Sequence, residues 1–209
     1  QPGSSPMDRV DQALVLPRIG QPQEGFLPVQ FHVPDRGGIW VKLDMGRIVA
    51  GFVQLELACA AGTEFDLSYT EEPIRLGTHF GRMRAGTRYI ARGHHDRFGL
   101  FDSIGFRYAY LLVHSVPGGV TLQDFAVQEY QHPWSEPASF ECSDPLLEQI
   151  FQAGLRTVQL CSPDAFVDCP TREQRAWTGD GVVHQMVHLA ANRDWRLAKR
   201  YVELGNSPR

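Results

Sequence analysis

The hydrophobic pattern of the chain changes once along its length, near Trp134, and this change constrains the fold more than any single motif. Before it, apolar and polar residues alternate, as in residues 53–57 and 64–69. After it, apolar residues recur every three or four positions. A period of two marks a strand with one buried face, whereas the longer spacing marks an amphipathic helix. The pattern therefore predicts a β domain followed by a helical one.

The β pattern extends from about Val29 to Tyr130. Further strands are predicted at residues 39–44, 88–92, 106–113 and 120–130, and Gly-containing turns separate them at residues 35–38, 61–63 and 117–119. Many strands joined by such turns favour an antiparallel β-sandwich of the jelly-roll type. Residues 72–86 are rich in Gly and Arg and are predicted to form a long loop.

Three helices are predicted in the second part of the chain. The first begins at Ser143-Asp144-Pro145, where a capping side chain and an acid precede a proline, and runs to about Leu160. The second spans residues 181–191, and the third follows Asp194, an expected cap, and ends near Gly205. The apolar face of the second helix is predicted to consist of Val182, Val183, Met186, Val187 and Ala190.

These patterns predict an α+β multidomain chain, with a lead-in over residues 1–28, a β-sandwich over residues 29–135 and a helical domain over residues 136–209. Because the predicted helices have broad apolar faces, we expect the helical part to be the truncated start of a larger domain. The alternative is a complete chain whose helices pack back onto the sheet.

Composition excludes several classes of function. The net charge is −4 without a basic block, which argues against nucleic acid as a partner, and no apolar run is long enough to span a membrane. The four cysteines lack the spacing of a zinc site, so free thiols and a cytoplasmic location are favoured. Secretion or a periplasmic location stays open, because the chain does not begin with Met and its native N-terminus can be missing.

Residues 168–180 concentrate the polar chemistry of the chain. Carboxylates can bind sugar hydroxyls, an aromatic ring can cover the apolar face of a sugar, and one carboxyl can protonate a glycosidic oxygen. The alternative is an ion-paired loop between two helices, for example with a salt bridge between Glu173 and Arg175. The residues in question are Asp168, Arg172, Glu173, Arg175, Trp177 and Asp180.

His184 and His188 have the i, i+4 spacing of a metal site, but no third ligand is evident and apolar residues flank them. Ordinary helix histidines are therefore the favoured interpretation, and we predict neither a metal nor a cofactor.

The segment Asp168-Cys169-Pro170-x-Arg172-Glu173-x-Arg175-x-Trp177-Thr178-Gly179-Asp180 resembles a motif of the bacterial α-L-rhamnosidases of glycoside hydrolase family 78. Weaker matches follow the order of that family at residues 44–51, 69–72, 89–93, 105–108 and 140–147. Members are inverting hydrolases with an (α/α)6 catalytic barrel preceded by β-sandwich domains. The resemblance covers nearly the whole chain from about Ile39 and implies that the helical part begins such a barrel.

The resemblance implies a role for each matching residue. Glu173 falls at the position of the general acid, and nearby carboxylates and burial against Trp177 would keep it protonated. Asp168, Arg172, Trp177 and Asp180 fall at positions that bind the sugar. Many members have an acidic pair and one more residue in this loop, so the chain carries the shorter variant.

The implied activity is removal of terminal α-L-rhamnose from glycosides or polysaccharides. The implied partners are this carbohydrate and the remainder of the barrel, and a homo-oligomer stays open. The family's general base lies beyond Arg209, so we expect the 209-residue chain alone to be inactive. Two alternatives remain, a non-catalytic carbohydrate-binding or interface module and an (α/α)6 hydrolase for another sugar, such as a uronide.

Overall fold

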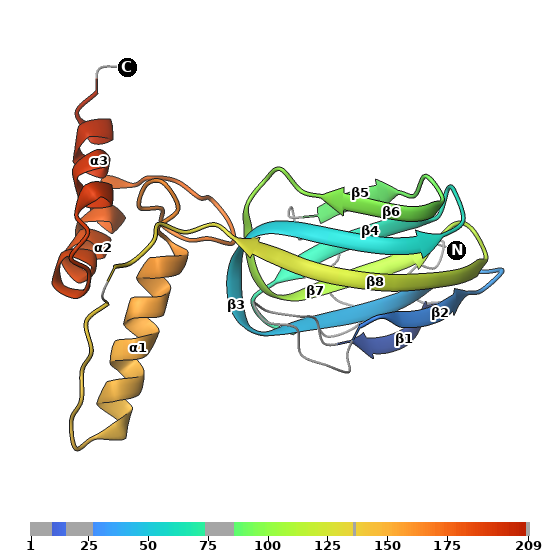
Figure 1. Ribbon diagram of the computed structural model, residues 1–209, viewed down its shortest axis with the longest axis horizontal. Coiled ribbons are helices and arrows are strands. Elements are labelled where there is room, and N and C mark those ends of the chain that lie inside the picture. The colour runs from blue at the N-terminus through green and yellow to red at the C-terminus, as the bar shows by residue number, and fades with distance from the viewer. Residues whose placement is uncertain (1–9, 16–26, 74–85, 136, 208–209) are drawn as a thin grey trace, which may run out of the picture. The chain divides into compact units, whose positions relative to one another are not determined.

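A computed structural model describes residues 10–15, 27–73, 86–135 and 137–207 of the chain. The chain divides into two compact units, residues 1–129, called the β unit, and residues 130–209, called the helical unit. The described strands all lie in the β unit and the described helices in the helical unit (Figure 1). The predicted fold class, a β-sandwich followed by the helical start of a barrel, is confirmed, whereas the predicted loop lies mostly outside the described residues.

The β unit forms one sheet of eight strands, in which most neighbouring strands are antiparallel. Strand β1, which pairs parallel with β3, was not predicted and is the exception among the described strand pairs. The strands are β1 (Val10–Val15), β2 (Val29–Val33), β3 (Gly38–Cys59), β4 (Glu64–Thr70), β5 (Gly86–Ile90), β6 (His94–Gly99), β7 (Ile104–His114) and β8 (Gly118–Glu129).

Strand β3 is the structural centre of the β unit. Its first part pairs with β1 and β7, and its second part pairs with β6, β8 and the start of β7. The sequence predicts two separate strands here, but the chain continues through a bulge between Asp44 and Val49. At the bulge Gly46 has a φ of +75°, and its N–H donates to Oδ1 of Asp44 (2.8 Å). Strand β3 thus pairs with four other strands, β1, β6, β7 and β8.

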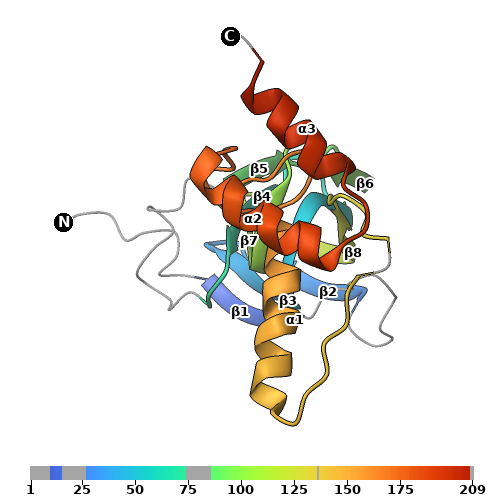
Figure 2. The ribbon, with the colours of Figure 1, turned by 90° about the vertical axis from the view of Figure 1, so that its left-hand side faces the viewer.

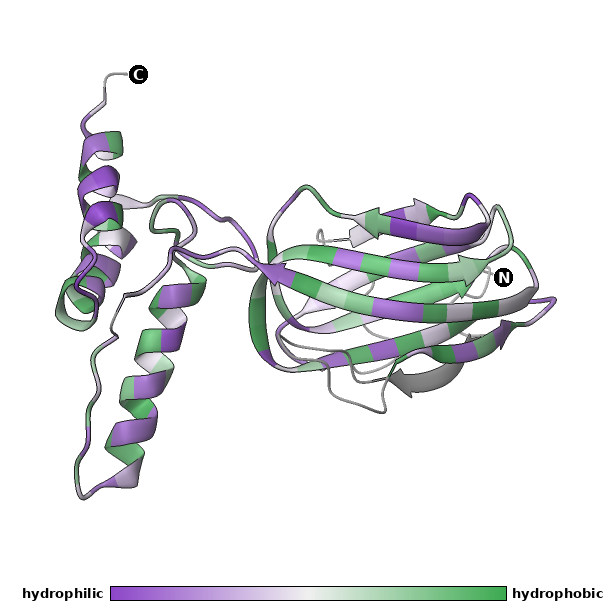
Figure 3. Cartoon of the chain, in the orientation of Figure 1, coloured by the Kyte–Doolittle hydropathy of each residue, from purple (hydrophilic) through white to green (hydrophobic). Residues whose placement is uncertain are grey.

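Both parts of β3 contribute to one hydrophobic core. Apolar and polar residues alternate along the strands, as the hydropathy colouring shows (Figure 3). The core-facing set includes Val41, Val53, Phe65, Phe106 and Phe125, all fully buried. The period-two pattern therefore identified the buried faces of these strands correctly.

The helical unit contains α1 (Pro145–Leu160), α2 (Thr178–Ala191) and α3 (Arg196–Gly205), which Figure 2 shows from the front. Helix α1 begins as predicted, because Oδ1 of Asp144 accepts the N–H of Leu146 (2.9 Å). The core of the unit lies between α1, α3 and the loop before α2, and consists of Val158, Phe166, Leu197, Ala198 and Tyr201. Within the described residues, no helix has the length and apolar character needed to cross a membrane.

Helix α2 differs from its prediction at its start. It begins three residues earlier, because the carbonyl of Trp177 already accepts the N–H of Gly181 (2.9 Å). The helix packs through Gly181, His188 and Ala191, which are buried, while Val182, Val183 and Met186 of the predicted apolar face are exposed in this chain. A small residue at position 181 lets α2 approach α3 closely, because a Cβ there would lie 2.1 Å from the hydroxyl oxygen of Tyr201.

Candidate functional site

The loop that joins α1 to α2 is closed by a pair of hydrogen bonds between Asp168 and Arg175. The N–H of Asp168 donates to the carbonyl of Arg175 (3.0 Å), and the N–H of Arg175 donates to Oδ1 of Asp168 (2.7 Å). Burial acts to raise the pKa of Asp168, but the backbone N–H groups of Arg175 and Cys169 outweigh it and hold the pKa below its ordinary value. Asp168 is therefore a carboxylate that both carries charge and fixes the loop.

The residues between these two form a tight turn. Glu173 and Gln174 both have left-handed backbone conformations, with φ values of +52° and +51°. Such conformations cost about 1–3 kcal/mol each for residues other than glycine, so the surroundings must hold them in place. The carbonyl of Arg172 accepts the N–H of Gln174 (2.5 Å) and the thiol of Cys169 (2.7 Å), and Nε2 of Gln174 donates to the carbonyl of Pro170 (2.7 Å).

This turn presents the carboxyl of Glu173 beside the ring of Trp177. Nε1 of Trp177 donates to Oε2 of Glu173 (3.4 Å), and the N–H of Trp177 donates to the carbonyl of Arg175 (3.0 Å). The expected contact of Glu173 with Trp177 is present, but the expected burial is wrong, because Glu173 is exposed and the tryptophan remains 55% exposed. Within the described part of the chain, Glu173 makes no ion pair with Arg175.

The other two predicted sugar-binding residues flank this pair. Asp180 lies in the first turn of α2, three residues after Trp177, and Arg172 lies directly before Glu173 in the turn; both are exposed. The structure thus collects an acid, an exposed indole and further charged groups on one loop and the helix that follows it. This set can bind a polar ring that has an apolar face.

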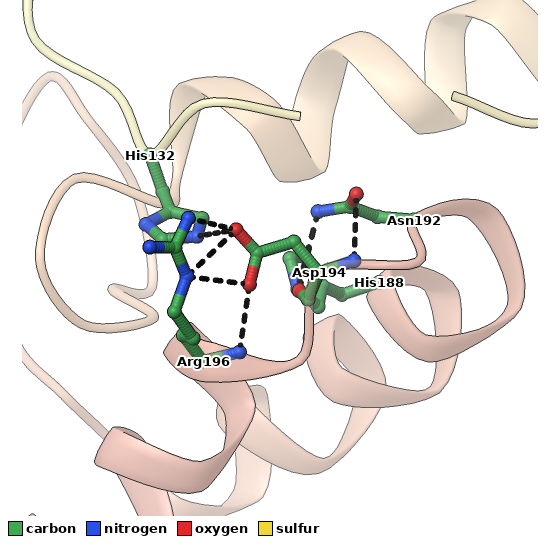
Figure 4. Close-up of polar contacts among 5 residues, drawn as sticks. All are labelled: His132, His188, Asn192, Asp194 and Arg196. Atoms are coloured by element: carbon green, nitrogen blue, oxygen red, sulfur yellow. Dashed lines mark hydrogen bonds and ion pairs between the residues drawn. The ribbon is translucent and has the colours of Figure 1, made fainter. Parts of the chain in front are cut away.

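A second polar cluster fixes the start of α3 (Figure 4). Oδ1 of Asp194 accepts the N–H of Arg196 (3.0 Å), Oδ2 accepts its Nη2 (2.5 Å), and Nε2 of His132 lies 3.4 Å from Oδ2. Hydrogen bonds from Arg196 hold the pKa of Asp194 far below its ordinary value. The sequence predicts Asp194 as the cap of α3, but the N-cap is Trp195, and Asp194 accepts the N–H of the first helical residue from one position earlier.

The two histidines of α2 have different surroundings. His188 is fully buried, and its Nε2 lies 2.8 Å from the carbonyl oxygen of Asp194, so this nitrogen must carry the proton. Burial lowers the pKa of His188 and also that of His184, although Asp180 and Asp168 oppose the shift at His184. In the part of the chain that the structure describes, no three His, Cys, Asp or Glu side chains are grouped as they would be around a metal ion.

Tyr201 of α3 is not among the site residues predicted from the sequence. In the structure its hydroxyl donates to the carbonyl of Trp177 (2.6 Å), so it contacts the candidate site from the last helix. A tyrosine among apolar helix positions is typical of a core residue, and no local pattern indicates which distant carbonyl its hydroxyl reaches.

Comparisons with known proteins relate this chain to bacterial α-L-rhamnosidases. Residues 135–204 match the family model of the six-hairpin glycosidase domain of bacterial α-L-rhamnosidases. A family 78 rhamnosidase of Bacillus sp. GL1 is 29% identical, with a TM-score of 0.79, over 84% of this chain and 19% of that protein. No curated protein is significantly similar in sequence.

Two further solved structures share the fold at lower identity. A rhamnosidase from Klebsiella oxytoca with rhamnose bound is 18% identical, with a TM-score of 0.68, over 83% of this chain and 36% of that one. The α-L-rhamnosidase from Dictyoglomus thermophilum is 19% identical, with a TM-score of 0.62, over 78% of this chain and 19% of its own. The chain thus spans from about a fifth to about a third of the solved rhamnosidases that it resembles.

Proposed function

We infer that this chain, a relative of the bacterial family 78 α-L-rhamnosidases, carries the proton-donating half of an inverting glycosidase site. The parent enzyme would remove terminal α-L-rhamnose from glycosides or polysaccharides. The observation that carries this proposal is the turn at Glu173, which presents a carboxyl beside the half-exposed ring of Trp177 within the segment that matches the family model.

Each group of the loop has a chemical task in this proposal. Glu173 is the general acid that protonates the leaving oxygen. Trp177 covers the apolar face of the sugar, while Asp168 and Asp180 accept hydrogen bonds from its hydroxyls and Arg172 donates to them. The ionised state of Asp168 suits an acceptor, because a carboxylate makes stronger hydrogen bonds to hydroxyl groups than a neutral carboxyl does.

Inversion needs a second carboxylate that activates water on the opposite face of the sugar. In inverting enzymes the two carboxyl groups stand roughly 6.5–9.5 Å apart, which leaves room for that water. We assign no residue of this chain to the base. We therefore expect the 209-residue chain alone not to release p-nitrophenol from p-nitrophenyl α-L-rhamnoside, and robust release would contradict this assignment of roles.

Leaving-group dependence in the full-length protein tests the acid. Glu173→Gln should slow hydrolysis of methyl α-L-rhamnoside by at least about 100-fold, because an alkoxide needs the proton. A 2,4-dinitrophenyl rhamnoside, whose leaving group needs no proton, should be affected much less. Glu203→Gln, an exposed change on α3, is the matched control and should leave both rates unchanged. Wild-type turnover of the methyl glycoside by Glu173→Gln would remove Glu173 from this role.

The sugar and the stereochemistry can be tested together. Proton NMR of the first product from the α-L-rhamnoside should show β-L-rhamnose before mutarotation, as inversion requires. First-formed α-L-rhamnose would instead indicate retention. Preferred hydrolysis of a p-nitrophenyl uronide over the rhamnoside would favour a related hydrolase for another sugar.

A further inference from the structure

Tyr201 connects the last helix of the unit to the candidate site. Its side chain is buried on α3, and its hydroxyl donates to the backbone carbonyl of Trp177 (2.6 Å). The ring of Phe166 packs edge-on against the ring of Tyr201, with centroids 5.4 Å apart. Because the tyrosine ring is confined by its neighbours, the hydroxyl is a fixed point from which the loop can be held.

The carbonyl that Tyr201 contacts already has a partner. It accepts the N–H of Gly181 (2.9 Å), which is the first hydrogen bond of α2. Removal of the tyrosine hydroxyl would therefore not leave a buried acceptor without a donor, which is the situation that makes lost hydrogen bonds costly. The hydrogen bond from Tyr201 is thus not needed to give the carbonyl of Trp177 a donor, but it restricts where this carbonyl can lie.

The position of the Trp177 backbone matters because little else fixes its side chain. The indole is about half exposed, so packing constrains it weakly. The backbone of Trp177, in contrast, is held at both groups. Its N–H donates to the carbonyl of Arg175, and its carbonyl accepts hydrogen bonds from Gly181 and Tyr201. The indole Nε1 in turn contacts the carboxyl of Glu173.

We propose that Tyr201 is a positioning residue for proton transfer, which holds the Trp177 backbone so that the indole keeps the Glu173 carboxyl in place. This inference rests on the proposed function of Glu173. Tyr201 itself touches neither the sugar nor the reacting atoms in this account, and its effect is transmitted through one hydrogen bond and one side chain.

The test compares Tyr201→Phe with Tyr89→Phe in the full-length protein. Tyr89 is a matched control, because its hydroxyl donates to Oδ2 of Asp96 (2.9 Å) in the β unit. With Tyr201→Phe, kcat for methyl α-L-rhamnoside should fall about fivefold, the size expected for one hydrogen bond, while kcat for the dinitrophenyl glycoside changes less than twofold. Tyr89→Phe should change neither. An equal loss on both substrates, or no loss on either, would overturn the proposal.

Failure of this inference can be told apart from failure of the proposed function. If Glu173→Gln shows the leaving-group dependence and Tyr201→Phe does not, Glu173 keeps its role and the positioning role of Tyr201 is wrong. If Glu173→Gln shows no dependence either, the proposed function itself is wrong.

A spectroscopic readout on the 209-residue chain is independent of turnover. The indole N–H resonance of Trp177, assigned by its loss in Trp177→Phe, should shift in Tyr201→Phe and stay in place in Tyr89→Phe. An unshifted resonance in Tyr201→Phe would show that the hydroxyl does not set the environment of the indole and would also overturn the proposal.

Discussion

A Cβ atom on Gly181 would lie 2.1 Å from the hydroxyl oxygen of Tyr201 and 2.2 Å from the ring carbon that bears it. No side chain fits at this distance, so the contact between α2 and α3 requires glycine. The requirement is one of space rather than backbone conformation, because Gly181 lies within α2.

We therefore expect Gly181→Ala to destabilise the helical unit by about 1–3 kcal/mol, the usual cost of overpacking a close contact. Gly154→Ala is the matched control, since Gly154 is exposed within α1 and a Cβ there meets nothing within 4 Å. It should stabilise the unit by up to about 1 kcal/mol through helix propensity. Urea denaturation, together with amide exchange of α2 and α3, measures the stability of the helical unit in both variants. Equal urea midpoints for the two variants would contradict the expectation.

A similar contact occurs in the β unit, where a Cβ on Gly51 would lie 2.0 Å from the carbonyl oxygen of Gln128. The obstacle is backbone, which cannot turn aside as a side chain can. Gly51→Ala should therefore cost about 3 kcal/mol or more and lower the protection of β3 amides against exchange. Gly119→Ala in β8, where a Cβ meets nothing, should stay within about 1 kcal/mol of the unmodified chain. A neutral Gly51→Ala would show that β3 and β8 can separate without cost.

Asp168 and Asp180 should respond differently to removal of their carboxyl groups. Asp168 accepts the N–H of Arg175, so Asp168→Ala should lower both the stability of the helical unit, by about 1–2 kcal/mol, and the activity of the full-length protein. Asp180 is exposed, and Asp180→Ala should reduce activity with a stability change below about 0.5 kcal/mol. Thermal denaturation together with kcat/KM separates the two cases, and equal stability losses would refute the distinction.

The buried histidine of α2 predicts a dependence of stability on pH. Burial lowers the pKa of His188 in the folded state, so the unfolded chain takes up a proton first as the pH falls below about 6.5. The unfolded state then binds more protons, and the stability of the helical unit should decrease from pH 7.5 to pH 5.5. His184, which is shifted in the same direction, should add to the slope.

His188→Gln tests the source of this slope, because an amide can still donate to the carbonyl of Asp194 but does not titrate in this range. Between pH 7.5 and pH 5.5, the urea midpoint of His188→Gln should fall by less than that of the unmodified chain. His95→Gln, a change of an exposed histidine in the β unit, should leave the slope of the helical unit unchanged. Identical slopes for all three proteins would exclude His188 as a source.

The success of prediction from sequence differed between local and long-range features. Strand faces followed from alternation, and the start of α1 followed from the capping side chain of Asp144, because both depend on neighbouring residues. The packed face of α2 could not be read from the apolar pattern, because the exposed residues Val182, Val183 and Met186 are apolar while the buried position 188 is a histidine. There Nε2 of His188 lies 2.8 Å from the carbonyl oxygen of Asp194, a partner that no local pattern indicates.

The candidate site shows the same division. The resemblance of residues 168–180 pointed to Glu173 and its neighbours, but neither the left-handed turn nor the hydroxyl of Tyr201 could be read from this segment. Both depend on hydrogen bonds whose partners are set by the folded chain. The continuity of β3 was missed because a glycine at a bulge and a glycine at a turn between two strands look alike in sequence. Strand β1 was also missed, and its partner strand β3 lies far along the chain.

The bond from Tyr201 to Trp177 also sets the smallest piece of this protein that an engineer could transplant. A graft that copied residues 168–180 onto another helical scaffold would bring Glu173, Trp177 and both aspartates. It would leave behind the hydroxyl of Tyr201, which holds the backbone of Trp177. It would also place an arbitrary residue at the position of Gly181, where only glycine leaves room for the tyrosine. A donor segment that runs through α3 is the shortest one that keeps its own anchor.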